Sequence, residues 1–205
     1  MTRIAFTADL HVDTYGSRID PATGLNAREV DILGTTAWVA GQARELECET
    51  LVVAGDFTES KVPPKAPRVA RIRRALSEGP GRQIHVRGNH DSEQAGDSIV
   101  TELAATPGWS GHMRPGVERV GDVAVCVIPF LSRGWLRVQP GFEAVSDAEV
   151  YRILGEQYLA IARGLFVQAE TAGARAAILV GHQQLSGGRM TESQQAFLGD
   201  LDLVV

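Results

Sequence analysis

Residues 84–91 read IHVRGNHD, a short apolar run that stops abruptly at a cluster of polar residues. An apolar run of this length bounded by polar residues is typical of a buried strand. The same design recurs as IAFTADLH at 4–11, LVVAGD at 51–56 and AAILVGH at 176–182. The sequence therefore predicts a set of buried strands that each end in Asp, Asn or His.

Helix-like segments alternate with these runs. A segment at 27–47, with Asn26 as a candidate N-cap, follows the first run, and the basic segment RVARIRRALS at 68–77 follows the second. Strands that alternate with helices favour an α/β fold with a parallel sheet.

The second half of the chain is less regular. VERV at 117–120 and VAVCVIPF at 123–130 flank Gly121-Asp122 and predict a β-hairpin with a two-residue turn. Ser146 and Glu149 form a capping-box pattern ahead of a long amphipathic segment. Further helices are expected at 93–105, 150–172 and 191–197.

Composition limits the classes of protein to consider. With 205 residues, the chain is expected to form one domain over residues 1–205. The acidic Asp9 comes before any apolar segment long enough for a signal peptide. No later apolar run reaches the roughly 18 residues of a membrane span. Two distant cysteines give no disulfide framework, so a cytoplasmic protein without membrane contact is predicted.

Polar residues at the strand ends are the candidate site. They are Asp9, His11, Asp56, Asn89 and His182. Each one alone is explained as well by a helix cap or a turn. Because the carboxyl ends of parallel strands meet at one edge, the set is expected to converge, and carboxylates gathered against an apolar sheet require a cation or substrate.

The ligand types narrow the cofactor. Asp, Asn and His without thiolates suit manganese, iron or zinc, with magnesium a further alternative. Two divalent ions that share a carboxylate can clamp the attacking and leaving oxygens of a phosphoryl group. We take two Mn²⁺ ions as the leading expectation.

The motifs Asp9-Leu-His11, Gly55-Asp56, Gly88-Asn89-His90-Asp91 and Gly181-His182 resemble, in order, those of the calcineurin-like metallophosphoesterase superfamily. This resemblance implies an α/β/β/α sandwich of two mixed sheets flanked by helices. Within the superfamily, VAGD, the Pro-rich stretch after it, GNHD and VGHQQLSGG look like the nuclease subunits of SbcD-type DNA-break repair complexes.

The resemblance implies a role for each motif residue. Asp9 and His11 would hold the first metal, Asp56 would bridge both, and Asn89 and His182 would hold the second.

It also implies two catalytic residues. His90 would lie over the substrate and either stabilise the developing charge or protonate the leaving oxygen, and Asp91 would orient the His90 imidazole. Glu59, His85 and His112 are expected to be structural or surface residues.

The proposed lineage implies DNA as substrate and partner. Between Lys61 and Arg87 there are eight basic residues and one acid, Glu78, despite a net charge of -5 for the chain. This stretch is either a solvated helix face or a phosphate-binding patch. The predicted DNA contacts are Lys61, Lys65, Arg68, Arg71 and Arg87.

One departure from the superfamily concerns the chain end. No Gly-His-x-His segment follows His182, and the LDLVV run at 201–205 resembles the strand that would lead into it. The resemblance therefore implies a domain truncated at its C-terminus, without the segment that docks a coiled-coil ABC-type ATPase. It also implies a homodimer, the common state of relatives of this kind.

Metal-dependent hydrolysis of DNA is the leading hypothesis for the function. The alternatives are a non-catalytic DNA- or partner-binding domain and a small-molecule phosphoesterase.

Overall fold

The computed structural model describes residues 1–60, 63–92 and 94–183. Its strands are β1 (Ile4–Thr7), β2 (Thr50–Ala54), β3 (Gln83–Val86), β4 (Trp109–His112), β5 (Gly116–Val120), β6 (Val123–Ile128) and β7 (Ala176–Gly181). Its helices are α1 (Ala27–Glu45), α2 (Ala66–Leu76), the 3-10 turn η1 (Ala95–Asp97), α3 (Ile99–Ala104), α4 (Arg133–Arg137) and α5 (Val150–Thr171). The helix expected at 191–197 and the LDLVV run lie outside the described residues.

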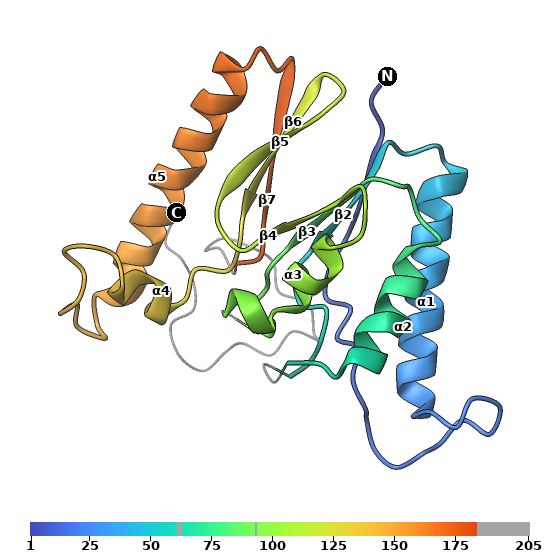
Figure 1. Cartoon of the computed structure of the whole chain (residues 1–205). Coiled ribbons are helices and arrows are strands. Elements are labelled where there is room, and N and C mark those ends of the chain that lie inside the picture. The colour runs from blue at the N-terminus through green and yellow to red at the C-terminus, as the bar shows by residue number, and fades with distance from the viewer. Residues whose placement is uncertain (61–62, 93, 184–205) are drawn as a thin grey trace, which may run out of the picture.

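Two sheets pack face to face with helices on both outer sides (Figure 1). The first sheet has the order β1-β2-β3-β4, and the second has the order β5-β6-β7. α1, α2 and α3 cover the first sheet, while α4 and α5 cover the second. The predicted α/β/β/α sandwich is thus confirmed.

The two sheets differ in strand direction. Within the described residues all pairs of the first sheet are parallel, whereas β5 is antiparallel to β6 and β6 is parallel to β7. Only the second sheet is therefore mixed. The parallel pairs follow from the helical connections, since a crossover through a helix returns the chain in the same strand direction.

Strand β2 shows why the apolar runs are continuous. Successive side chains of a strand point to opposite faces. Leu51 and Val53 therefore enter the core under the helices, and Val52 enters the core between the sheets, where it meets Val125 and Val127. Both faces of the strand are covered, so neither requires polar residues.

Helix boundaries follow the sequence signals in part. Asn26 caps α1 as predicted, because its Oδ1 accepts hydrogen bonds from the backbone N–H of Arg28 and Glu29. The predicted capping box before α5 is not formed. Ser146 Oγ donates to Glu149 Oε2 at 2.7 Å, so the two side chains bind each other rather than the backbone at the helix start.

The helix expected at 93–105 is confirmed in its second part, as α3. Before α3 the chain forms η1 and an extended Ser98 rather than a continuous helix. The unpredicted strand β4 follows and pairs in parallel with β3. Gly111 of β4 permits this packing, because a Cβ there would come within 2.6 Å of the Val100 carbonyl oxygen on α3.

Two further features concern the chain as a whole. None of the helices in the described ranges combines the length and apolar character needed to cross a bilayer. Cys48 and Cys126 are free thiols, in agreement with the absence of a disulfide framework.

Candidate metal centre

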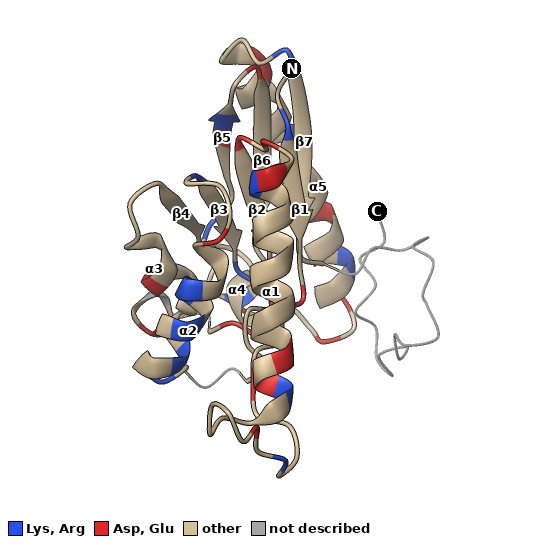
Figure 2. Cartoon of the chain, turned by 90° about the vertical axis from the view of Figure 1, so that its right-hand side faces the viewer, with Lys and Arg blue, Asp and Glu red and all other residues tan. Residues whose placement is uncertain are grey.

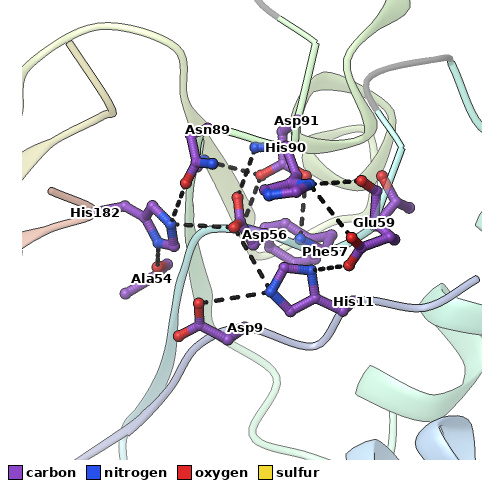
Figure 3. Close-up of polar contacts among 12 residues, drawn as sticks. Asp9, His11, Ala54, Asp56, Phe57, Glu59, Asn89, His90, Asp91 and His182 are labelled. Atoms are coloured by element: carbon purple, nitrogen blue, oxygen red, sulfur yellow. Dashed lines mark hydrogen bonds and ion pairs between the residues drawn. The ribbon is translucent and has the colours of Figure 1, made fainter. Parts of the chain in front are cut away.

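The predicted strand ends converge at one edge of the sandwich. β1, β2 and β3 of the first sheet and β7 of the second each lead into a loop at this edge. Figure 3 shows the side chains that these loops bring together, which are Asp9, His11, Asp56, Asn89, His90 and His182. Residues separated by 173 positions of sequence, from Asp9 to His182, thus form one cluster.

His182 lies between two oxygen ligands. Its Nε2 is 3.2 Å from Asp56 Oδ2 and 2.9 Å from Asn89 Oδ1. Ligand atoms that share one ion at bond lengths of about 2.0–2.2 Å lie about 3 Å from each other, so this spacing fits a common cation. His182 Nδ1–H donates to the Ala54 carbonyl oxygen at 2.7 Å, which leaves Nε2 as the nitrogen with a lone pair for a metal.

Asp56 is shared with a second group of ligands. His11 Nε2 lies 3.7 Å from Asp56 Oδ2 and 3.8 Å from Asp9 Oδ1. Asp9, Asp56 and His182 each offer a ligand atom within 4.8 Å of the others. The Asp56 carboxylate therefore lies close to both His11 and His182, as a bridging ligand must.

The backbone of the cluster is strained. Only four non-glycine residues of the described chain have positive φ, and three of them are Asp9 (55°), His11 (47°) and Asp56 (53°). Such conformations cost about 1–3 kcal/mol each and gather at functional sites. The Asp9 N–H donates to Gly55 O at 3.1 Å and the His11 N–H to Asp56 O at 2.9 Å, so the two loops hold each other in place.

Two glycines of the motifs allow close approach. A Cβ on Gly55 would overlap the His182 imidazole, and a Cβ on Gly88 would overlap Oδ1 and the backbone nitrogen of Asp56. Gly55 also has φ of 91°. These positions exclude a larger residue because the ligands occupy the space where its side chain would begin.

Asp91 has a different role from the one predicted. Its buried carboxylate accepts hydrogen bonds from the backbone N–H groups of Asp56 (3.0 Å), Phe57 (3.0 Å) and Gly88 (2.9 Å). No hydrogen bond joins it to the His90 imidazole in the described structure. Asp91 orients the Asp56 and Gly88 loops because its oxygens lie under their backbone rather than beside the ring.

His90 is oriented by Glu59 instead. His90 Nδ1–H donates to the Glu59 backbone oxygen at 2.5 Å, and the His90 backbone N–H donates to Asp56 Oδ1 at 2.8 Å. The Glu59 carboxylate lies 2.8 Å from His11 Nδ1 and 3.9 Å from His90 Nδ1. Sequence reasoning placed Glu59 outside the site, although its position in the loop after Asp56 was a signal that it could reach the ligands.

The electrostatics fit a cation. Burial tends to raise the pKa of Asp56, but the hydrogen bond and charge of His182 outweigh it and lower the pKa of this carboxyl. Burial tends to lower the pKa of His182, but the Asp56 carboxylate raises it to about 9. The oxygens thus draw a proton to the position where a metal would bind, and a divalent cation would satisfy the same oxygens.

Two other histidines are structural. His85 is fully buried in edge contact with Phe57 and Trp109, and burial lowers the pKa of its imidazole to about 3. His112 is the last residue of β4, and its Nε2 is 2.7 Å from Glu118 Oε1.

The basic stretch is only partly available to a ligand. Figure 2 shows the arginines of this stretch that lie on α2 in blue. Lys65 is exposed, but Arg68 pairs with Asp13 at 2.8 Å and Arg71 pairs with the buried Glu29 at 2.5 Å.

Arg87 does not belong to this surface. It is 4% exposed, and its guanidinium donates to the Phe130 and Gly88 carbonyl oxygens. The predicted DNA contact at Arg87 is therefore wrong, because the side chain links two loops inside the protein. Lys61 lies outside the described residues.

Comparisons with known proteins identify the family and the fold. The family model described as calcineurin-like phosphoesterase matches residues 2–205. A crystal structure of a dimetal phosphatase from Danio rerio shares the fold, with 11% sequence identity, a TM-score of 0.50, and coverage of 89% of this chain and 70% of that one. No curated protein matches significantly, and neither match supports the narrower SbcD-type assignment. On the family match, the chain belongs to the calcineurin-like phosphoesterase family.

Proposed function

We propose that this chain hydrolyses phosphate esters at a centre of two divalent metal ions. The observation that carries the proposal is the convergence of one further carboxylate, one amide and two imidazoles around the Asp56 carboxylate. Membership of the phosphoesterase family supports it independently.

Each ligand has an assigned place in this proposal. Asp9 and His11 would hold one ion, Asp56 would contact both, and Asn89 and His182 would hold the other. Bound ions supply Lewis acidity toward the phosphoryl group and toward the attacking water. Mn²⁺ is the ion we expect, with iron, zinc or magnesium as alternatives, because the ligands are oxygens and imidazoles.

The chain's own residues would handle protons and position. His90 Nδ1–H is held by the Glu59 backbone oxygen, so Nε2 is the nitrogen left to carry a proton to the leaving-group oxygen. Asp91 fixes the loops that present Asp56 and Asn89 through its three backbone hydrogen bonds. We therefore regard His90 as the catalytic residue and Asp91 as a positioning residue.

A small phosphate ester is the substrate class we favour. The DNA prediction rested on the SbcD-type resemblance, which the comparisons do not support, and on five basic residues, of which Arg87 is buried and Arg68 and Arg71 are paired with carboxylates. DNA hydrolysis is kept as the second candidate on the exposed Lys65 and the basic surface of α2. An ATPase partner, a homodimer and a cytoplasmic location stay predictions.

The test measures metal binding and turnover together. Metal-stripped protein is titrated with Mn²⁺ by calorimetry, and is then assayed with p-nitrophenyl phosphate, bis(p-nitrophenyl) phosphate, and linear and circular DNA. We expect two Mn²⁺ ions per chain and Mn²⁺-dependent release of nitrophenol. Asp56→Asn should reduce turnover by more than the roughly 10- to 100-fold that follows loss of an outer-shell partner.

The matched control is Asp147→Asn, the same change at an exposed carboxylate paired with Arg137. It should behave as wild type. No Mn²⁺ binding would refute the proposal. Mn²⁺ binding without turnover of any substrate would favour the non-catalytic alternative, and turnover of DNA alone would favour the nuclease.

A further inference from the structure

A cleft of about 570 Å³ opens beside the candidate metal centre on the side of His11. Its lining includes Asp9, His11, Tyr15, Arg28 and Glu59. A group bound here would therefore be next to the ligands proposed for the first metal.

Tyr15, one of the lining residues, is held in place by hydrogen bonds. The Tyr15 hydroxyl lies 3.0 Å from the His11 carbonyl oxygen and 3.2 Å from Glu59 Oε2. The Tyr15 N–H donates to Asn26 Oδ1, and Asn26 Nδ2 donates to the Tyr15 carbonyl oxygen. Because Asn26 also caps α1, which carries Arg28 in its first turn, the backbone at Tyr15 and the backbone at Arg28 are linked through Asn26.

Arg28 is the unusual member of the lining. Its side chain is exposed and acts electrostatically on the Tyr15 hydroxyl, yet across the described ranges its guanidinium makes no hydrogen bond or ion pair. In contrast, Arg68 and Arg71 on α2 are paired with carboxylates. Arg28 thus keeps its fork of N–H donors available to a ligand in the cleft.

The acids of the cleft do not occupy Arg28. The Glu59 carboxylate is engaged by His11 and lies near the Tyr15 hydroxyl. Asp9 faces His11 at 3.8 Å and is a proposed metal ligand. A guanidinium can bind a phosphate or a carboxylate through two parallel hydrogen bonds. Arg28, which lies beside the proposed phosphate-binding centre, could therefore bind a second anionic group of the same ligand.

We infer that Arg28 binds a second anionic group of the substrate, so that the chain prefers small organic phosphates that carry two phosphoryl groups over those that carry one. The inference rests on the proposed function, because the first phosphoryl group is placed at the metal centre. Arg28 determines specificity in this scheme and takes no part in the chemical step.

The test separates binding from turnover by using analogues that are not hydrolysed. Methylenebisphosphonate and methylphosphonate are titrated by calorimetry into Mn²⁺-loaded wild type, Arg28→Ala, Arg28→Lys and Arg18→Ala. Arg18 is an exposed arginine that does not line the cleft, so Arg18→Ala controls for the loss of one positive charge. All titrations use one Mn²⁺ concentration, since bisphosphonate also binds free Mn²⁺.

We expect Arg28→Ala to weaken bisphosphonate binding about 10-fold, as loss of a charged hydrogen bond does, and to leave methylphosphonate binding and Mn²⁺ affinity unchanged. Arg28→Lys should recover part of the loss, and Arg18→Ala should match wild type. Equal weakening of both analogues, or an unchanged affinity for bisphosphonate, would overturn the inference. Absence of Mn²⁺ binding in all four proteins would instead overturn the proposed function on which it rests.

Discussion

Asp91→Asn tests whether the buried carboxylate holds the metal-binding loops in place. In the native protein Oδ2 accepts two backbone N–H groups and Oδ1 accepts one. An amide keeps the shape but has one acceptor oxygen. In its better orientation that oxygen serves Asp56 and Gly88, and the NH₂ group faces the Phe57 N–H.

The size of the effect follows from these three bonds. One charged hydrogen bond is lost, worth about 1.5–3 kcal/mol, and the other two become weaker neutral bonds. Burial and then the charge of Asp56 raise the pKa of Asp91, which shows that the ionised carboxylate is itself costly and offsets part of the loss. We expect a net decrease of about 2 kcal/mol in the free energy of unfolding, small enough for the protein to stay folded.

Urea unfolding of metal-stripped protein measures this change without a contribution from metal binding. With a slope of about 2 kcal/mol per molar, the midpoint should fall by about 1 M urea. Asp147→Asn, at an exposed carboxylate, should stay within about 0.5 kcal/mol of wild type. An Asp91→Asn midpoint equal to or above that of wild type would refute the reasoning, since the cost of burying the charge would then exceed the gain from its hydrogen bonds.

Three further predictions concern glycine packing and buried titratable groups. Gly88→Ala should destabilise the protein by about 1–3 kcal/mol and weaken Mn²⁺ binding, because the added Cβ would overlap the backbone of Asp56. Gly34→Ala on α1 is the control, since a Cβ there meets open space, and it should be neutral or stabilising. Urea unfolding and calorimetric Mn²⁺ titration measure both variants. Partial burial raises the pKa of Glu118, but its hydrogen bonds outweigh burial and lower the pKa to about 2. The ionised Glu118 therefore stabilises the fold above pH 4.5, and this contribution, at most about 3 kcal/mol, is lost as the pH falls toward 2. Glu118→Gln should reduce the loss of stability between pH 4.5 and 2 in a series of urea unfolding curves. Burial lowers the pKa of His85 to about 3, so its ring should remain neutral at pH 5 in nitrogen NMR spectra, and a charged ring at that pH would contradict the packing described.

The presence of a polar residue at the end of each apolar run was enough to predict which side chains meet. Asp9, Asp56 and Asn89 follow parallel strands, and the carboxyl ends of such strands share an edge whatever their order. His182 could be added because β7 ends in the same motif, although the sequence does not reveal that β7 belongs to the second sheet.

Finer features depended on side-chain directions that sequence spacing does not contain. Neighbouring residues in a turn can point to different sides, and so Asp91 reaches backbone N–H groups while His90 reaches Glu59. Arg87 appears charged and available in sequence, but its position after β3 places it inside. Strand β4 was missed because Trp109–His112 has no apolar alternation and takes its place from packing against α3.

The origin of the ligands in both sheets has a consequence for unfolding. Asp9, His11, Asp56 and Asn89 come from the first sheet, whereas His182 comes from the second and is tied to the first by its hydrogen bond to Ala54. Under the proposed function, the ion held by Asp56, Asn89 and His182 would therefore link the two sheets. Separation of the sheets would break this site, and added metal would favour the packed arrangement by mass action. Occupancy of the centre would then report on the integrity of the whole sandwich.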